Sequence, residues 1–335
     1  MTDATDFTDL IDVAAERLGG AALRANDEFF APKEDLLKAS APEWREGVYT
    51  DRGKWMDGWE TRRRRTPGHD WCLIRLGIPA VIRGVVVDTS FFRGNYPEHC
   101  SLEACELTDA DDVDELSEAR GAPWTEILTR SALTGDTRHL FPILHGARVT
   151  HLRFNIYPDG GVARLRVHGE PAPGPELFLP GTETDLAAMQ HGGFVVVCSD
   201  MFFGHRQNLI QPGRSINMGD GWETRRRRGP GHDWTIVRLA RRGVLRRVEL
   251  DTDYYKGNAP GSCMLEWCDA PDATAAALVK PSRKWISLVP ETPLEPDGRH
   301  EFEVAGAGGP ATHVRLNIYP DGGVARLRLF GTTAP

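Results

Sequence analysis

The chain has 335 residues, of which 40% are hydrophobic and 26% charged, and its formal net charge is −8. These proportions are typical of a globular protein and exclude a disordered chain, while the acidic balance argues against a nucleic-acid-binding protein. No run of about 18 apolar residues occurs, and the start of the chain lacks the basic and apolar regions of a secretory signal. We therefore expect a cytoplasmic protein with neither a membrane nor a nucleic acid as partner.

Helical spacing is confined to two short segments. Residues 7–18 predict a helical lead-in that spans residues 1–18, and a second short helix is expected near residues 185–190. Residues 19–169 form a first unit, and residues 170–185, which begin with the Pro- and Gly-rich stretch EPAPGPELFLPG, are the expected linker. Residues 186–335 form the second unit.

The two units are copies of each other. The stretch DGWETRRRRTPGHDW at residues 57–71 returns as DGWETRRRRGPGHDW at residues 220–234. HLRFNIYPDGGVARLRVHG, from His151, returns as HVRLNIYPDGGVARLRLFG, from His313. A copy of roughly 150 residues is large enough to bury its own core, so we expect two tandem domains related by duplication.

Within each copy the apolar residues mostly alternate with polar ones. In the first copy, short runs of this kind lie at residues 71–76, 85–89, 101–105, 124–128, 152–156 and 162–167. Turn residues separate them, as is typical of an all-β sandwich. The stretch Tyr157-Pro-Asp-Gly-Gly161 is expected to close a tight hairpin between two strands.

The cysteines predict free thiols. Cys100 and Cys105, like Cys263 and Cys268, are five residues apart, an odd separation that sends strand side chains to opposite faces. No C-x₂-C metal spacing occurs. Buried reduced thiols are therefore expected, which fits a cytoplasmic protein.

Four consecutive arginines stand out in each copy. On a strand, Arg62 and Arg64 would share one face and Arg63 and Arg65 the other, so the run would not form one basic patch. Glu60 precedes the run, and His69 and Asp70 follow it. Carboxylate, guanidinium and imidazole groups beside one turn could bind a small anion and catalyse proton transfer to or from it. The alternative is a solvated arginine face beside a turn in which Asp70 caps the backbone and His69 packs on Trp71.

These duplicated motifs, together with D-T-x-[FY]-[FY]-x-G-N-x-P, resemble those of the allantoicase family, and the resemblance covers essentially the whole chain. It implies two tandem jelly-roll β-sandwich domains of the galactose-binding type. It also implies a homo-oligomer that takes part in purine degradation by hydrolysing allantoate to (S)-ureidoglycolate and urea.

The implied reaction assigns roles to the candidate residues. Loss of urea breaks a C–N bond, which requires a general acid for the departing ureido group and a general base for water. The catalytic candidates are Glu60, His69, Asp70, Glu223, His232 and Asp233. We expect the carboxylate to be held by Arg62 or Arg64 with Arg225 or Arg227, and the ureido arms to be read by Asn95, Asn155, Asn258 and Asn317.

Two other functions stay open at this point. Jelly rolls of this type also serve as non-catalytic ligand- or carbohydrate-binding modules. The His, Asp and Glu set could instead hold a divalent metal, but adjacent His69 and Asp70 match no recognised metal spacing, so no cofactor is expected.

The copies differ beside the GN motif. The first has Tyr96, Glu98 and His99 where the second has Ala259, Gly261 and Ser262. One hypothesis places the substrate across a pseudo-two-fold axis between domains, with these residues deciding which arm leaves. The competing hypothesis gives each domain its own pocket, one of them vestigial.

Overall fold

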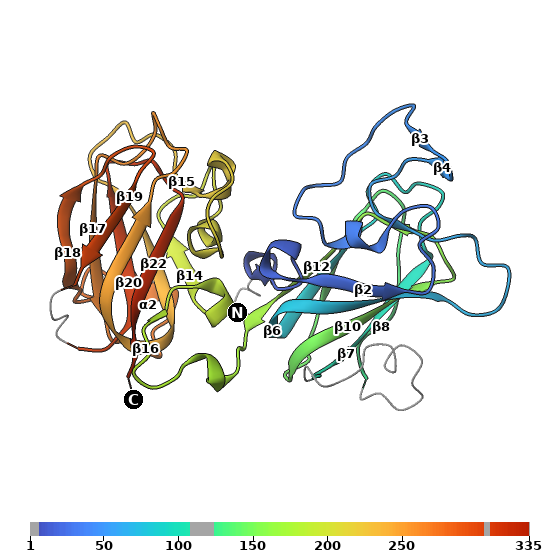
Figure 1. The fold of residues 1–335 in the computed structure, drawn as a ribbon, viewed down its shortest axis with the longest axis horizontal. Coiled ribbons are helices and arrows are strands. Elements are labelled where there is room, and N and C mark those ends of the chain that lie inside the picture. The colour runs from blue at the N-terminus through green and yellow to red at the C-terminus, as the bar shows by residue number, and fades with distance from the viewer. Residues whose placement is uncertain (1–6, 108–123, 305–308, 335) are drawn as a thin grey trace. The chain divides into compact units, whose positions relative to one another are not determined.

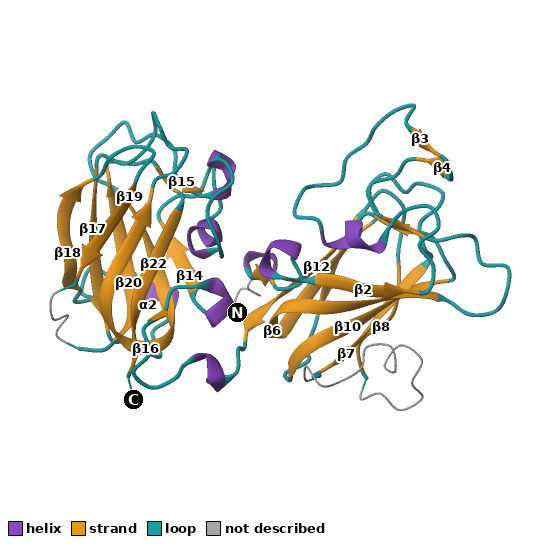
Figure 2. Cartoon of the chain, in the orientation of Figure 1, coloured by secondary structure: helices purple, strands orange, loops and turns teal. Residues whose placement is uncertain are grey.

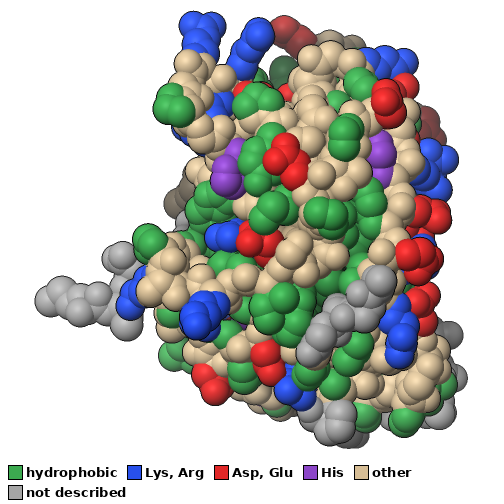
Figure 3. Space-filling model, turned by 90° about the vertical axis from the view of Figure 1, so that its left-hand side faces the viewer, with side chains coloured by type: hydrophobic (Ala, Val, Ile, Leu, Met, Phe, Trp, Pro, Cys, Tyr) green, Lys and Arg blue, Asp and Glu red, His purple; other side chains and the backbone are tan. Residues whose placement is uncertain are grey.

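The computed structural model describes residues 7–107, 124–304 and 309–334. The chain divides into two compact units, Met1–Ala172 and Pro173–Pro335, here called the first and second domains. Both are jelly-roll β-sandwiches in which strands dominate and helices are short (Figures 1 and 2). Among the described residues, no helix is long and apolar enough to cross a membrane. Basic and acidic side chains are interspersed over the face shown in Figure 3.

The first domain contains twelve of the described strands and three 3-10 helices. The strands are β1 (Ile11–Asp12), β2 (Ala21–Ala25), β3 (Tyr49–Thr50), β4 (Gly53–Lys54), β5 (Trp59–Glu60), β6 (Asp70–Asp88), β7 (His99–Cys105), β8 (Thr125–Ala132), β9 (Arg138–Pro142), β10 (Arg148–Tyr157), β11 (Gly161–Val162) and β12 (Arg164–Pro171). The 3-10 helices are η1 (Phe7–Asp9), η2 (Glu16–Leu18) and η3 (Lys33–Leu37).

The second domain repeats this order. Its strands are β13 (Thr184–Asp185), β14 (Phe194–Cys198), β15 (Trp222–Glu223), β16 (Asp233–Asp251), β17 (Ser262–Cys268), β18 (Ile286–Pro293), β19 (Arg299–Glu303), β20 (Ala311–Tyr319), β21 (Gly323–Val324) and β22 (Arg326–Thr333). Its helices are η5 (Met189–His191), η6 (Arg206–Ile210), η7 (Met218–Asp220) and α2 (Ala275–Leu278), and η4 (Pro175–Leu177) lies in the connection that precedes them.

One long strand belongs to both layers of each sandwich. The first half of β6 pairs with β2 and β10, and its second half pairs with β12 and β9. Asp70 at its start lies opposite Ile156, and Asp88 at its end lies opposite Arg164. In the second domain, β16 pairs with the equivalent strands: β14 and β20 along its first half, and β22 and β19 along its second half. The apolar residues of both layers meet between them and form the core.

For residues 7–18 the predicted helical lead-in is wrong, and its first six residues lie outside the described part of the chain. Residues 7–18 form η1 and η2 around β1, whose Ile11 pairs with Gly169 of β12. The Asp12 carboxylate accepts hydrogen bonds from the backbone N–H groups of Val167 and Ala14. Tertiary pairing therefore overrides the helical spacing, and the segment is an edge of the first sandwich.

The short helix expected near residues 185–190 is wrong for the same reason. Thr184 and Asp185 form β13, which pairs with β22, and the next turn is the 3-10 helix η5. The chain passes from one domain to the other at Ala172–Pro173. The last two residues of the expected linker thus belong to a strand of the second domain.

The turn at residues 157–161 does not close a hairpin. Among the described strands, β10 and β12 both pair with β6 and not with each other. The turn instead crosses between layers, and Gly161 of β11 lies opposite Glu60 of β5. Gly161 also donates its N–H to the carbonyl of Asn95 at 2.7 Å. A Cβ at Gly161 would lie 1.9 Å from the ring of Phe92, so only glycine fits there.

All six cysteines are free, and five of them are buried, as the spacing predicted. Burial raises the pKa of Cys100 to about 12 and that of Cys263 likewise to about 12. These thiols are therefore protonated and inert at neutral pH.

A buried ion pair fastens the loop that follows η3 to the sandwich. Arg164, at the start of β12, is 1% exposed and donates from Nη2 to Asp57 Oδ2 at 2.6 Å. The same guanidinium donates to the carbonyls of Ser40 and Asp57, at 3.0 and 3.1 Å. Both ends of residues 39–56 are thereby tied to one strand. Arg326 and Asp220 form the equivalent pair in the second domain, at 2.8 Å.

We expect Asp57→Ala to destabilise the first domain by about 3–5 kcal/mol, because it leaves the buried Arg164 charge without its partner. Urea unfolding measures the effect. Glu43→Gln is the control, since Glu43 pairs with Arg45 on the exposed surface and such a pair contributes less than about 1 kcal/mol. Equal midpoints for the two variants would contradict the role assigned to the buried pair.

Candidate functional site

The two domains differ in the length of one loop. Eighteen residues separate Lys38 from Asp57, whereas eight separate the equivalent Gln211 from Asp220. The first domain therefore carries ten extra residues in residues 39–56, here called the insertion. The insertion contains the two-stranded sheet β3–β4, which extends beyond the sandwich of its domain (Figure 1).

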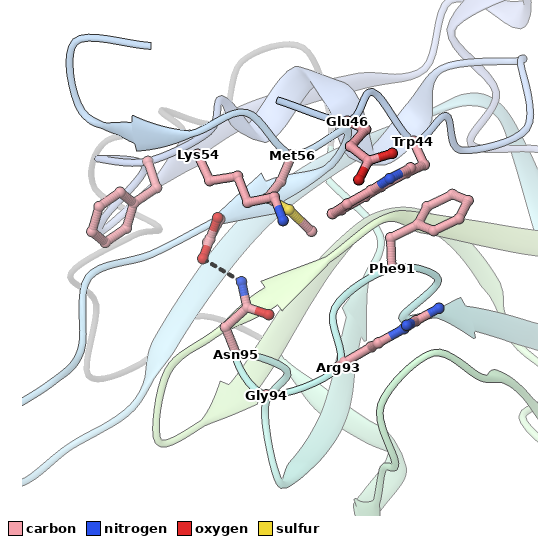
Figure 4. A pocket seen from close by; sticks show the side chains of 10 residues that line it. Trp44, Glu46, Lys54, Met56, Phe91, Arg93, Gly94 and Asn95 are labelled. Carbon is pink, nitrogen blue, oxygen red and sulfur yellow. Dashed lines mark hydrogen bonds between the residues drawn. The ribbon is translucent and has the colours of Figure 1, made fainter. Parts of the chain in front are cut away.

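The insertion forms one wall of a cavity of about 610 Å³ (Figure 4). The lining residues are Phe30, Trp44, Glu46, Lys54, Met56, Glu60, Phe91, Arg93, Gly94 and Asn95. In Figure 4 the side chains of Trp44, Glu46, Lys54 and Met56 lie along one side, and Phe91, Arg93 and Asn95 come from the loop opposite. The volume is in the range of sites that bind small molecules.

A second cavity, of about 500 Å³, continues from the first. Both are lined by Phe30, Glu60, Gly94 and Asn95, so we treat them as one cleft with Glu60 and Asn95 at the junction. The second part is lined further by Thr61, Arg63, Arg64, Tyr96, Glu98, Pro158, Asp159 and Gly160. Its wall thus combines the arginine run, the GN loop and the crossing turn.

Glu60 has the environment of a proton donor. It ends β5, is 9% exposed, and its Oε1 accepts a hydrogen bond from Asn95 Nδ2 at 2.7 Å (Figure 4, dashed line). Burial raises the pKa of Glu60, and the Asn95 hydrogen bond offsets only part of that effect. A carboxyl group with a raised pKa at the junction of a cleft is suited to general acid–base work.

The arginine run follows β5 without continuing as a strand. Its backbone is held by the crossing turn, because Thr61 donates to the Gly160 carbonyl and Arg64 N–H to Asp159 Oδ2. Arg62 forms an ion pair with Asp27 at 2.6 Å and is not among the residues that line the cleft.

The next two arginines do line the cleft. The Arg64 guanidinium donates to Asp70 Oδ1 from Nη2 at 2.7 Å and from Nε at 3.1 Å. Arg63 is exposed, and no carboxylate partner of Arg63 is found within the described part of the chain. Of the two clamp candidates in the first domain, the structure therefore brings Arg64 to the cleft and leaves Arg62 outside its lining.

His69 and Asn155 form a second polar cluster outside the lining of the cleft. His69 Nε2 lies 3.3 Å from Asn155 Oδ1, and the imidazole ring packs against the Tyr157 ring at a tilt of 35°, with ring centroids 4.6 Å apart. Asn155 Nδ2 donates to Glu103 Oε2 at 3.1 Å. Burial lowers the pKa of His69, so this imidazole is neutral at physiological pH. His69 thus packs on Tyr157 rather than on Trp71.

Asp70 serves as an internal brace. It is buried at the start of β6 and accepts hydrogen bonds from Arg64 and from Asn26 Nδ2, the latter at 3.0 Å. Its carboxylate therefore holds the arginine run against the sandwich. Neither Asp70 nor His69 lines the cleft, and their predicted catalytic roles stay predictions.

The second domain reproduces most of these contacts, but Ser199 takes the place of Asn26 beside Asp233. Asn258 Nδ2 donates to Glu223 Oε1 at 2.5 Å, and His232 Nε2 lies 3.1 Å from Asn317 Oδ1. Arg225 pairs with Asp200 at 3.0 Å, and Arg227 pairs with Asp233.

The short loop of the second domain, residues 212–219, contains no aromatic residue and no lysine, so it has no counterpart of Trp44 or Lys54. Phe203, Met218 and Tyr254, which adjoin the Glu223–Asn258 pair in the sequence or in space, are all exposed. Glu223 is half-buried, whereas Glu60 is buried. The two copies thus share their polar contacts and differ in enclosure.

Sequence reasoning missed the aromatic and cationic wall of the cleft. The signal that could have located Trp44, Lys54 and Met56 is the length difference between the repeats. Phe92 is fully buried, whereas its neighbour Phe91 has a left-handed backbone with φ of 69° and faces the cavity. Of the residues that distinguish the repeats, Tyr96 and Glu98 line the cleft, and His99 does not.

Metal ligands are not gathered at either constellation. Within residues 7–107, 124–304 and 309–334, no group of three or more His, Cys, Asp and Glu side chains is arranged to hold a metal ion. The predicted set of Glu60, His69 and Asp70 is instead divided between the cleft and the interior contacts described above.

We expect Glu60→Gln to stabilise the protein at about pH 7 and to lose this advantage on acidification. The folded state raises the pKa of Glu60, so its stabilising contribution is complete below the ordinary glutamate value and disappears as the pH rises through the folded value. Thermal unfolding at several pH values measures this. Glu223→Gln, at the half-buried position, is the control and should change stability less; a Glu60→Gln variant less stable than the wild type at pH 7 would refute the argument.

Comparison with known proteins places the chain in a family. The family model described as Allantoicase repeat matches residues 11–172 and 184–334. The chain is 49% identical over 327 residues to a probable allantoicase of Pseudomonas aeruginosa (strain UCBPP-PA14), with 97% of each chain covered. It is 47% identical over 324 residues to the allantoicase of Dictyostelium discoideum, covering 95% of this chain and 86% of that one.

A solved structure has the same fold. The crystal structure of allantoicase from Saccharomyces cerevisiae superposes with a TM-score of 0.79 at 33% identity and covers 99% of this chain and 98% of that one. Both repeats and the full length are therefore matched. The chain belongs to the allantoicase family.

Proposed function

We propose that this chain hydrolyses allantoate to (S)-ureidoglycolate and urea in the cleft of the first domain. The observation that carries the location is Glu60: a buried carboxyl group with a raised pKa, hydrogen-bonded to Asn95 at the junction of a cleft that is also lined by cationic side chains. The family membership supports the reaction, since the relatives that match over nearly the full length are named allantoicases.

The first chemical step uses protonated Glu60 as the general acid. It donates a proton to the ureido nitrogen that departs, and the C–N bond breaks with its electron pair going to that nitrogen, which leaves as urea. The lone pair of the remaining ureido nitrogen forms a C=N bond to the central carbon. Burial of Glu60 favours the protonated form that this step needs.

The second step uses the same carboxylate as the general base. Water adds to the central carbon, its proton returns to Glu60, and the C=N electron pair returns to nitrogen. The products are ureidoglycolate and urea, so one water molecule is consumed for each allantoate. Asn95 donates to Glu60 throughout and can orient the carboxyl group toward the reacting nitrogen.

In this proposal the other predicted site residues hold the walls of the cleft in place. Arg64 lines the cleft while Asp70 holds its guanidinium, and His69 with Asn155 supports the crossing turn through Tyr157. The equivalent residues of the second domain, including Asn258 and Asn317, form the same contacts beside a loop that is ten residues shorter. We assign turnover to the first domain.

A non-catalytic binding module is not favoured, because the family match spans both repeats. As part of the proposal, the protein is a cytoplasmic homo-oligomer that acts without a resident metal.

We expect Glu60→Gln to lower kcat for urea release from allantoate by at least about 100-fold, because general acid–base catalysis contributes about 10²–10⁴-fold. Glu223→Gln is the matched control at the equivalent position and should stay within about threefold of the wild type. A coupled urea assay measures both. Equal losses in the two variants would place catalysis in both domains, and no urea release by the wild type would end the hydrolase proposal.

We expect dialysis against a chelator to leave the rate of urea release unchanged, because Glu60 supplies the proton transfers in the proposed steps. The assay is run before dialysis, after dialysis and after addition of Mn²⁺ or Zn²⁺. Activity that is lost on dialysis and restored by either ion would show that a metal takes part.

A further inference from the structure

Lys54 is the cation that the insertion contributes to the cleft. Its Nζ lies 4.1 Å from the ring centroid of Trp44, and both side chains line the cavity that contains Glu60 (Figure 4). Among the residues that the structure describes, no carboxylate lies within 4.0 Å of this ammonium group. Lys54 is thus held in place by an aromatic face while its charge has no anionic partner.

The other cations near the cleft have partners or lie elsewhere. Arg62 is paired with Asp27, Arg64 with Asp70, and Arg93 Nε with Asp136 at 3.1 Å. Arg63 is unpaired among the described residues, but it lines the second part of the cleft. Lys54 is therefore the unpaired cation of the larger part, beside the apolar side chains of Trp44, Met56 and Phe91.

We propose that Lys54 binds the carboxylate of the substrate and so selects ureido compounds that carry an acid group. This inference rests on the proposed function and adds the group that recognises the anion. An ammonium group is a compact charge with three donors, and although Lys54 is exposed, its contact with Trp44 keeps that charge at the wall of the cavity. A substrate held by its carboxylate at Lys54 can place a ureido arm at the Glu60–Asn95 pair, because both lie in one cavity.

The second domain lacks this feature. The eight residues that replace the insertion, 212–219, contain a single cation, Arg214, which is paired with Asp253 at 2.5 Å. Carboxylate recognition at Lys54 thus accounts for an asymmetry between domains whose polar contacts are otherwise alike.

The test compares two substrates. Allantoate and methylenediurea carry the same two ureido arms, but only allantoate carries a carboxylate. We expect Lys54→Met to raise KM for allantoate about 10- to 100-fold, as for the loss of a hydrogen-bonded charge. The preference for allantoate over methylenediurea in kcat/KM should fall by a similar factor, and Lys54→Arg should restore most of it.

Two controls separate the possible explanations. Lys256→Met changes an exposed lysine of the second domain that pairs with Asp297 and should leave both substrates unaffected. Arg63→Met tests the other unpaired cation. An unchanged preference in Lys54→Met, or a loss that appears in Arg63→Met instead, would overturn the inference while wild-type urea release still supported the proposed function. A wild type that releases no urea from allantoate would remove both.

Discussion

The buried ion pair between Asp57 and Arg164 is the constraint on which the site depends. It ties both ends of the insertion to the start of β12, and the carbonyls of Ser40 and Asp57 share the same guanidinium. Loss of either side chain would leave the other charge buried without a partner. The loop between them can lengthen at small cost, because closure entropy grows slowly with length. The duplicated fold therefore tolerates an insertion in one copy while the anchor stays the same in both.

The insertion affects both the space for a ligand and the pKa of Glu60. Glu60 and Glu223 occupy equivalent positions and accept the same asparagine hydrogen bond. Only Glu60 lies in a cavity walled by Trp44 and Met56, and burial there raises its pKa. The residues that create room for a ligand thus also favour the protonated carboxyl group. One change in loop length provides both properties, which explains how two copies with the same polar contacts can differ in function.

The sequence predicted the duplication, the all-β sandwiches and the buried thiols, because periodicity and repeated motifs report directly on these features. It did not predict the edge strand β1, since Ile11, Val13 and Ala14 fit a helical stripe as well as a sheet edge and the choice is made by pairing with β12. The crossing turn was mistaken for a hairpin because turn residues do not reveal which strands pair. Trp44, Lys54 and Met56 were not predicted to line a cleft, because they lie outside the repeated motifs.

Comparing the two copies distinguishes residues that stabilise the fold from residues that act in function. Asp70 and Asp233 are equally buried and hold equivalent arginines, although the second copy lacks the enclosing wall. These arginine–aspartate contacts occur in both copies and are explained by the fold, since they keep the arginine run and the crossing turn against the sandwich. The proposed hydrolysis must then depend on two features that the insertion gives to the first copy. These are the buried state of Glu60 and the unpaired charge of Lys54.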